Sequence, residues 1–259
     1  MGAIRTYLVA LVLPLLAYPA SCGTGEVRIA AAADLKFALE EISREYVKSH
    51  PQVKVIPAFG SSGNFTAQLM NEAPFDVFLS ADMDYPRKLV TAGRATTESL
   101  FQYAIGHVVV WGANGSAINP AELRGDVFKD ARVKKIALAN PVHAPYGRAA
   151  EAALKKLGVY DGVKDKLVFG DNVAQAAQFA DSGAADIGLI ALSLAVSPTM
   201  KDKGRYWEIP TDAYPRMVQG GVILKSASDR SAAEFFRDYL LSAEGKAILK
   251  RYGFSEDNP

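Results

Sequence analysis

The sequence contains a single cysteine, Cys22, among 259 residues, so an internal disulfide is impossible. Its three histidines are scattered, and no Cys/His pattern has the spacing of a metal site. A P-loop, the glycine fingerprint of dinucleotide-binding folds and the G-x-S-x-G turn of serine hydrolases are also missing. These absences argue against the enzyme classes that such motifs mark.

An excess of charge of one sign is also absent, because 29 basic residues face 28 acidic ones and the net charge is +1. Nothing in this balance favours binding to nucleic acid or to an anionic membrane surface. The sequence shows no internal repeat, low-complexity tract or charge run. A hydrophobic share of 49% is ordinary for a soluble globular protein, and the length allows one large or two small domains.

Long hydrophobic runs are confined to residues 1–23. Arg5 is the only charge there, Tyr7 to Tyr18 is almost wholly apolar, and small residues follow. The apolar core is too short to cross the hydrocarbon layer, about 30 Å thick, which favours a secretory signal peptide over a transmembrane helix. We expect a mature protein that is exported to the periplasm or another extracytoplasmic space, is soluble and begins near residue 23–26.

Cys22 lies at the expected cleavage region and allows two interpretations. In the first, Cys22 is removed with the leader. In the second, it is the lipid-modified first residue of a lipoprotein. The sequence Ala20-Ser21-Cys22-Gly23 suits the second interpretation, whereas Pro19 stands where a lipoprotein signal usually has leucine.

Residues 27–42 predict a strand, a tight turn and a helix. Val27 to Ala33 is a short apolar run typical of a strand buried on both faces. Behind it Leu35, Leu39, Ile42 and Tyr46 share one helix face, and Asp34 stands where an N-cap belongs. Such a turn leaves the first N–H groups of the helix unpaired at the carboxyl edge of a sheet, which is a place to hold an anion.

Apolar segments and helical patterns alternate along the rest of the chain. Strands are expected at 53–59, 77–82, 107–111, 135–139, 167–169, 187–192, 206–209 and 220–224. This alternation predicts an α/β fold with mostly parallel sheets and helices on both faces. Some 235 residues of such units exceed one core, so we expect two lobes, with chain crossings near 103–106 and 215–220.

Four segments share the design of an apolar strand, a turn of small or polar residues and a helix start. They are Ala33-Asp34, Ser61-Ser62-Gly63, Pro145-Tyr146-Gly147 and Asp171-Asn172-Val173. In α/β sheets such turns lie at the carboxyl ends of strands, where ligands bind. Each turn alone indicates no more than a helix cap, but four together favour an anion site.

Several stretches resemble the periplasmic molybdate-binding proteins of ABC importers. They are IAAAADLKFALEEI, FGSSGNF, APFDVFLSAD, NPVHAPYGRAAEAALKKLG, DNVAQAA and KRYGF, and they run in order over residues 26–254. The resemblance implies the type II periplasmic-binding-protein fold, with two α/β lobes, a ligand cleft and a hinge. It also implies a monomer that binds a dehydrated tetrahedral oxyanion through hydrogen bonds, has no cofactor or cation site, catalyses no reaction and serves a membrane permease.

The resemblance also places the ligand-binding residues. Asp34 falls at the first binding turn, Ser62 supplies its hydroxyl and N–H at the second, and Tyr146 and Val173 supply backbone N–H groups at the third and fourth. Further candidates near these positions are Ala33, Ser61, Asn64, Asn172 and Ala191.

Two positions depart from the best-known form of the family, which has serine in place of Asp34 and tyrosine in place of Ala191. A carboxylate directed at a dianion would be strongly repelled. We therefore expect Asp34 to offer its N–H and to turn its side chain back as a helix cap. Tyr146, Ser61, Asn64 or a water is expected to replace the donor missing at Ala191.

The resulting prediction is a protein that captures molybdate or tungstate, which the sequence does not separate, and delivers it to an ABC permease. The first alternative is another tetrahedral oxyanion, such as sulfate or phosphate. A more distant alternative is a secreted serine hydrolase using Ser62, although no His–Asp relay is evident. The predicted lobes are 26–104 plus 220–259, and 105–219.

Overall fold

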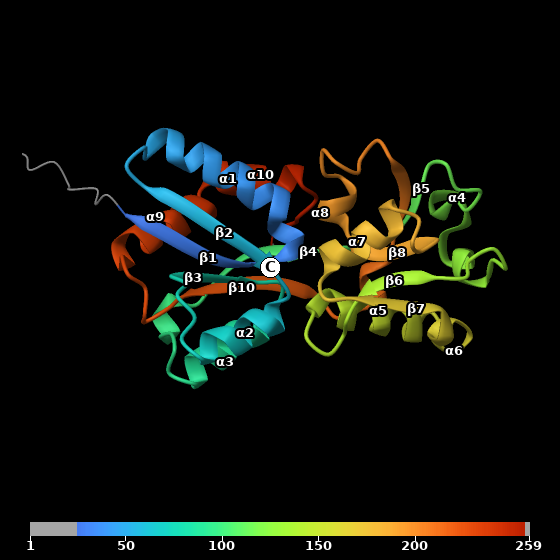
Figure 1. Ribbon diagram of the computed structural model, residues 1–259, viewed down its shortest axis with the longest axis horizontal. Helices are drawn as coiled ribbons and strands as arrows, with labels where there is room; N and C mark the ends of the chain where they lie inside the picture. The colour runs from blue at the N-terminus through green and yellow to red at the C-terminus, as the bar shows by residue number, and fades with distance from the viewer. Residues whose placement is uncertain (1–24, 257–259) are drawn as a thin grey trace, which may run out of the picture.

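Two five-stranded sheets lie end to end along the molecule, each covered by helices on both faces (Figure 1). The computed structural model describes residues 25–256. The first sheet has the order β2-β1-β3-β10-β4 and the second β7-β6-β8-β5-β9. The α/β fold class is therefore as predicted.

The first sheet is built mainly from the start of the chain and receives one strand from near its end. Its strands are β1 (Glu26–Ala32), β2 (Lys54–Gly60), β3 (Val77–Ser80), β4 (Phe101–Gly106) and β10 (Met217–Ile223). Its helices are α1 (Lys36–Ser49), α2 (Ser62–Met70), α3 (Asp84–Thr91), α9 (Arg230–Leu241) and α10 (Ala243–Arg251), and the short 3-10 helix η1 (Ala33–Leu35) joins β1 to α1.

The second sheet is formed by the middle of the chain. Its strands are β5 (Val108–Ala113), β6 (Ile136–Ala139), β7 (Leu167–Gly170), β8 (Ile187–Ala191) and β9 (Gly204–Glu208). Its helices are α4 (Pro120–Leu123), α5 (Pro145–Lys156), α6 (Tyr160–Val163), α7 (Val173–Asp181) and α8 (Leu192–Ala195). The remaining 3-10 turns cover 97–99, 124–129, 164–166 and 211–213.

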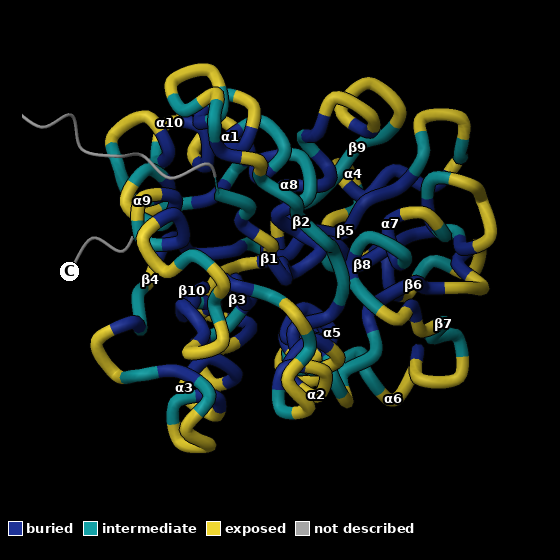
Figure 2. The backbone as a smooth tube through the Cα atoms, turned by 60° about the vertical axis from the view of Figure 1, so that its left-hand side comes forward, coloured by how far each residue is buried: buried dark blue, intermediate teal, exposed yellow. Residues whose placement is uncertain are grey.

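Strand β1 is buried on both faces from Ile29 to Ala32, as its apolar run predicts, whereas Arg28 is exposed. Val27, Ile29 and Ala31 pack in a cluster with residues of α1, α9 and α10, whereas Ala30 packs in a second cluster with residues of α2 and α3. Successive side chains of a strand point to opposite faces, so every position of β1 next to a helix layer must be apolar. The central strands β3, β6 and β8 are fully buried, whereas the edge strand β2 is mostly intermediate, as Figure 2 shows.

The sheets are mixed rather than mostly parallel, which corrects the prediction. Strand β1 pairs in parallel with β2 and β3, and β6 pairs in parallel with β7 and β8. In contrast, β10 runs antiparallel to β3 and β4, and β5 runs antiparallel to β8 and β9. The strands in antiparallel pairs include those that carry the chain between the sheets. Strand β4 leads into β5 across one residue, His107, and β10 brings the chain back to the first sheet.

The predicted division into lobes 26–104 plus 220–259, and 105–219, stays a proposal that the sheet order supports. The sheets suggest slightly different limits, because β4 belongs to the first sheet up to Gly106 and β10 belongs to it from Met217. We propose that these two crossings form the hinge between the lobes.

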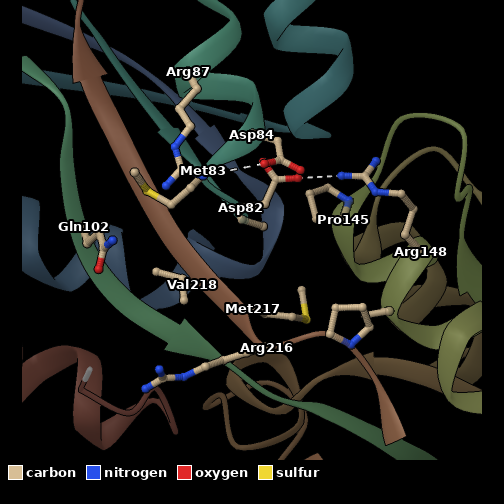
Figure 3. A pocket seen from close by; sticks show the side chains of 13 residues that line it. Asp82, Met83, Asp84, Arg87, Gln102, Pro145, Arg148, Arg216, Met217 and Val218 are labelled. Carbon is tan, nitrogen blue, oxygen red and sulfur yellow. Dashed lines mark hydrogen bonds and ion pairs between the residues drawn. The ribbon is translucent and has the colours of Figure 1, made fainter. Parts of the chain in front are cut away.

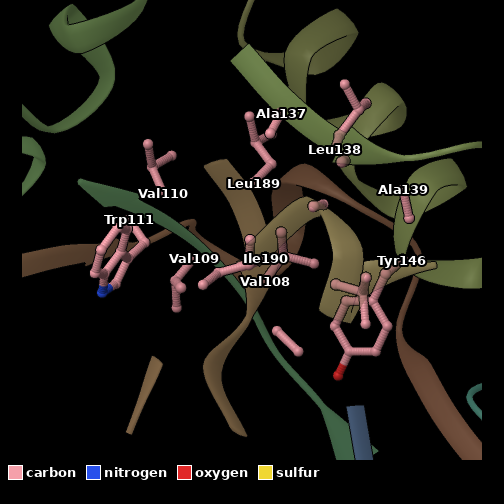
Figure 4. Packing of buried hydrophobic residues seen from close by; sticks show 14 of the residues in the cluster. Val108, Val109, Val110, Trp111, Ala137, Leu138, Ala139, Tyr146, Leu189 and Ile190 are labelled. Carbon is pink, nitrogen blue, oxygen red and sulfur yellow. The ribbon is translucent and has the colours of Figure 1, made fainter. Parts of the chain in front are cut away.

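The hydrophobic cluster that packs against the second sheet extends to the junction of the two lobes. Val108 to Trp111 of β5 pack with residues of β6 and β8 (Figure 4). Tyr146 of α5 belongs to the same cluster and is almost wholly buried, with its hydroxyl at the edge of the apolar side chains. This residue therefore anchors the start of α5 to the core of its own lobe.

Nothing in the described part of the chain forms a helix long and apolar enough to cross a membrane. The predicted signal peptide, including Cys22, lies outside the described residues.

Candidate functional site

One small pocket between the two sheets is lined by residues from all four predicted anion turns. The lining comprises Ala32, Ala33, Asp34, Gly60, Ser61, Ser62, Ala81, Ala144, Pro145, Tyr146, Asn172 and Val173. The tertiary structure thus brings together segments separated by more than a hundred residues. No lysine or arginine occurs among these described residues.

The register of the parallel strands explains this convergence. Ala32 at the end of β1 pairs with Gly60 at the end of β2, and Ala139 of β6 pairs with Gly170 of β7. Each of these strand ends is followed by a turn and a helix. Helices α2, α5 and α7 therefore begin at the pocket, where their first N–H groups lack partners within the helix. The positive ends of their dipoles favour an anion there.

Ser62 is fully buried and has a hydroxyl placed for donation. Its Oγ accepts a hydrogen bond from the N–H of Ala81 at 3.1 Å. Because this bond uses the oxygen as acceptor, the hydroxyl hydrogen remains free to point at a ligand.

Ser61 and Asn64 have mainly structural contacts. The Oγ of Ser61 accepts from the N–H of Asn64 at 3.3 Å and caps α2, and it also lies 3.0 Å from Nδ1 of His143. Asn64 is exposed and does not line the pocket. Its predicted role as a substitute donor is therefore not supported by its position.

The third and fourth turns present backbone rather than side chains. Tyr146 is the second residue of α5 and Val173 is the first of α7. The side chain of Asn172 caps α7, since its Oδ1 accepts from the N–H groups of Ala174 and Gln175 at 3.0 Å each. These contacts leave the N–H groups of Tyr146 and Val173 as the candidate donors.

Asp34 does not cap the helix, which corrects the prediction for its side chain. The N–H groups of Asp34 and Leu35 face the carboxylate and oppose part of the rise in its pKa, but among the described residues Oδ1 has no hydrogen-bond partner of normal geometry. Instead Oδ2 accepts from Nε2 of Gln219 at 2.6 Å, and the main-chain oxygen accepts from the Ser193 hydroxyl of α8 at 2.7 Å. The residue is 1% exposed. Burial raises the pKa of Asp34 to about 6, and hydrogen bonding by Gln219 and Tyr146 opposes part of this rise.

Gln219 is the residue that the sequence reasoning missed. It is fully buried in β10, and its Nε2 lies 3.3 Å from the hydroxyl of Tyr146 as well as close to Asp34. Its Oε1 accepts from the hydroxyl of Tyr103 at 2.9 Å. The signal was present, because Gln219 is the only polar side chain in the apolar strand Met217–Ile223.

Ala191 does not line the pocket. It is fully buried at the end of β8, where it pairs with Val108 of β5. The hydroxyl of Tyr146 contacts Gln219 and the carboxylate of Asp34, so it is engaged at the junction of the lobes.

The two lobes contact each other across the pocket. The N–H of Gly63 donates to the main-chain oxygen of His143 at 2.9 Å. The guanidinium of Arg148 on α5 donates to Asp82 Oδ2 at 2.5 Å and lies over the ring of Tyr85 on α3, 5.3 Å from its centroid. These contacts join the segments that carry the two sheets across the pocket.

A second cavity, of about 400 Å³, opens beside the pocket and shares Ala81 and Pro145 with it. Figure 3 shows Arg148 reaching from α5 to Asp82 at the wall of this cavity, with Arg87 and Arg216 at other parts of its lining. Within residues 25–256 no group of His, Cys, Asp and Glu side chains is arranged to hold a metal ion.

Known proteins resemble this chain over nearly its whole described length. The family model of bacterial extracellular solute-binding proteins matches residues 27–255. The molybdate-binding protein ModA of Azotobacter vinelandii is 38% identical over 229 residues, covering 88% of this chain and 89% of the relative. ModA of Rhodobacter capsulatus is 38% identical over 239 residues, covering 92% and 91%.

A solved structure shows the same architecture. The periplasmic molybdate-binding protein of Azotobacter vinelandii superposes with a TM-score of 0.84 and 33% identity, over 90% of this chain and 100% of that one. Together with the two-lobed fold and the pocket of four turns, this similarity shows that the chain belongs to the family of bacterial extracellular solute-binding proteins.

Proposed function

We propose that this protein captures molybdate or tungstate outside the cytoplasm and delivers it to an ABC permease. The observation that carries the proposal is the convergence of four strand-to-helix turns on one pocket without a basic side chain. A tetrahedral oxyanion suits such a site because it can accept several N–H and O–H hydrogen bonds at once. The relatives named molybdate-binding proteins support this choice of anion.

The donors that we assign to the ligand are the hydroxyl and N–H of Ser62 and the N–H groups of Asp34, Tyr146 and Val173. Charge-assisted hydrogen bonds contribute roughly 1.5–3 kcal/mol each. Donors fixed at helix starts do not reorganise when the anion enters, so several of them can offset the cost of dehydrating a dianion. Neutral donors are sufficient for this purpose.

The alternative of a serine hydrolase using Ser62 has little structural support. The Oγ of Ser62 contacts the N–H of Ala81, whereas the nearby His143 contacts Ser61. A base within hydrogen-bond reach of the nucleophile is the basic requirement of such catalysis. We therefore propose that the protein binds its ligand and catalyses no reaction. An assay of ester hydrolysis by the purified protein tests this proposal, and no hydrolysis is expected.

Export and anchoring form a separate part of the proposal. We infer that residues 1–23 direct export and that Cys22 is either removed or acylated. Acylation predicts that the native protein partitions with membranes and that Cys22→Ser releases it. Intact-mass analysis showing an unmodified terminus beyond residue 22 would exclude lipidation.

Calorimetric titration of the mature protein with molybdate, tungstate, sulfate and phosphate tests the anion. We expect molybdate and tungstate to bind, and the smaller sulfate and phosphate to bind much more weakly because the donors are fixed around a larger anion. Equal or tighter binding of sulfate or phosphate would support the alternative oxyanion. Light scattering after gel filtration tests the proposed monomer.

A further inference from the structure

The side chain of Asp34 is a buried acid at the edge of a pocket proposed for a dianion. It lines the pocket and is 1% exposed. Its Oδ2 accepts from Gln219, while Oδ1 is buried and has no hydrogen bond of normal geometry in the described structure. A buried carboxylate oxygen without a partner is costly when ionised.

The groups packed around this carboxylate are neutral. Gln219 comes from β10, Tyr146 from α5 and Tyr103 from β4. Burial and the negative charge of Asp34 raise the pKa of both tyrosines well above the ordinary value, so neither hydroxyl ionises near neutral pH. The Ser193 hydroxyl from α8 contacts the main chain of Asp34 rather than the carboxylate.

The charged and titratable groups of the surrounding elements are engaged elsewhere. The ammonium of Lys36 on α1 lies over the ring of Phe37, 5.5 Å from its centroid. His107, between β4 and β5, has its Nε2 2.8 Å from the Ser255 hydroxyl. After β3, Asp82 binds the guanidinium of Arg148. Before α7, Asp171 is exposed and its N–H donates to Gln175. No cation within residues 25–256 forms an ion pair with Asp34.

We propose that Asp34 is protonated whenever the oxyanion is bound, so that the site takes up one proton with each anion. The proton comes from solvent and returns to it when the anion leaves. On Oδ1 it converts an unpartnered acceptor into an O–H donor at the pocket, and it removes the negative charge that a dianion would meet there. This inference rests on the proposed oxyanion function.

The direction of the pH effect follows from the burial of the acid. Without ligand, burial already raises the pKa of Asp34 to about 6, and an adjacent dianion raises it further. Well below pH 6 the acid is protonated with or without ligand, and the affinity does not depend on the pH through this group. Above pH 6 binding requires proton uptake, so the affinity falls up to tenfold per pH unit until the pKa of the bound state is reached.

Calorimetric titration with molybdate between pH 5.5 and 8.5, in two buffers of different ionisation heat, measures the protons bound. The expected result is close to one proton taken up per anion near pH 7.5, with uptake falling to about a quarter of a proton at pH 5.5. Asp34→Asn carries a permanent neutral amide and is expected to bind without proton uptake and without the pH slope. Asp82→Asn is the matched control: the pKa of Asp82 is also raised by burial, yet this variant is expected to keep the uptake.

Binding of molybdate without proton uptake would overturn the inference while leaving the proposed function intact. A pH slope that persists in Asp34→Asn would overturn it too, because the proton would then reside on the ligand or on another group. Absence of molybdate binding at every pH would instead remove the proposed function, and this inference with it. If Asp34→Asn does not fold, infrared difference spectra of the parent protein decide, since ligand addition must produce the carbonyl band of a protonated acid.

Discussion

At the scale of single residues, we propose that Ser62 is the side chain on which anion affinity depends most directly. It is buried, it lines the pocket, and its only described side-chain hydrogen bond uses the oxygen as acceptor. We expect Ser62→Ala to lower molybdate affinity about ten- to a hundredfold, corresponding to roughly 1.5–3 kcal/mol, because a charge-assisted donor is lost. Titration calorimetry measures the change.

Ser242→Ala provides the control for Ser62→Ala. Ser242 caps α10 by accepting from the N–H of Gly245 at 3.2 Å, far from the pocket lining. Its loss is expected to lower the free energy of unfolding by about 1 kcal/mol and to leave affinity unchanged. Parent-like affinity in Ser62→Ala would mean that the anion lies elsewhere.

Asp34 also makes a prediction about stability in the absence of ligand. A folded-state pKa of about 6, against an ordinary value of 3.8 for an aspartate, means that the unfolded chain releases this proton at lower pH than the folded protein. The raised pKa therefore costs stability as pH rises above 4, and the full cost, about 3 kcal/mol, is reached above pH 6.

Asp34→Asn removes this pH-dependent cost and keeps an oxygen that can accept from Gln219. Relative to the parent, the variant is expected to gain about 1.5 kcal/mol in unfolding free energy between pH 5 and pH 8, from the two pKa values. Urea unfolding at the two pH values measures this gain. A constant difference would show that the acid titrates normally in the folded protein.

At the scale of elements, the start of α7 combines a helix cap with a wall of the pocket. The side chain of Asn172 accepts hydrogen bonds from two N–H groups in the first turn of α7, and the residue also lines the pocket. Aspartate and asparagine are about equally good helix caps, so Asn172→Asp is expected to preserve stability. It places a negative charge beside the anion, and we expect molybdate affinity to fall at least tenfold, about 1.4 kcal/mol or more.

The matched change at another cap separates charge from capping. Asn119 caps α4 through the N–H of Ala121 at 3.2 Å and does not line the pocket. Asn119→Asp is expected to leave both stability and affinity near the parent values. If Asn172→Asp bound molybdate as tightly as Asn119→Asp, the start of α7 would not face the ligand.

At the scale of the whole molecule, Arg148 links the two lobes. It contacts Asp82 and the Tyr85 ring from the opposite lobe, and the Asp82 side chain is only 17% exposed. A half-exposed ion pair with a cation–π contact contributes modestly, about 1 kcal/mol. We therefore expect Arg148→Ala to release molybdate about three- to tenfold faster, because opening breaks fewer contacts, with little change in the association rate. Stopped-flow fluorescence measures both rates.

Arg87→Ala is the control for the contact between lobes. Arg87 lines the same cavity but pairs with Asp84 of its own helix, at 3.7 Å. It is expected to leave dissociation unchanged. Equal dissociation rates in Arg148→Ala and Arg87→Ala would exclude Arg148 as a link that slows opening.

X-ray scattering should show that saturating molybdate makes the parent protein more compact, as hinge closure requires.

The sequence by itself indicated most of the order of strands and helices, although not β4 or the short helices α4, α6 and α8, together with the strand-to-helix turns and the family resemblance. These features are local. Burial on both faces makes β1 apolar from Ile29 to Ala32, and the side chains of Ser61 and Asn172 cap helices a few residues ahead. Four strand-to-helix turns were enough to predict a shared pocket, because such turns fall at the carboxyl edge of α/β sheets.

Only the tertiary structure decided what the Asp34 side chain contacts, in which direction β5 and β10 run, and which groups join the lobes. The partner of Asp34, Gln219, lies 185 residues away, and local propensity predicted a helix cap instead. The Asp82–Arg148 pair spans 66 residues. Contacts at such separations depend on how the two sheets are placed relative to each other. The free energy of burying Asp34 without a cation depends on every element packed around it.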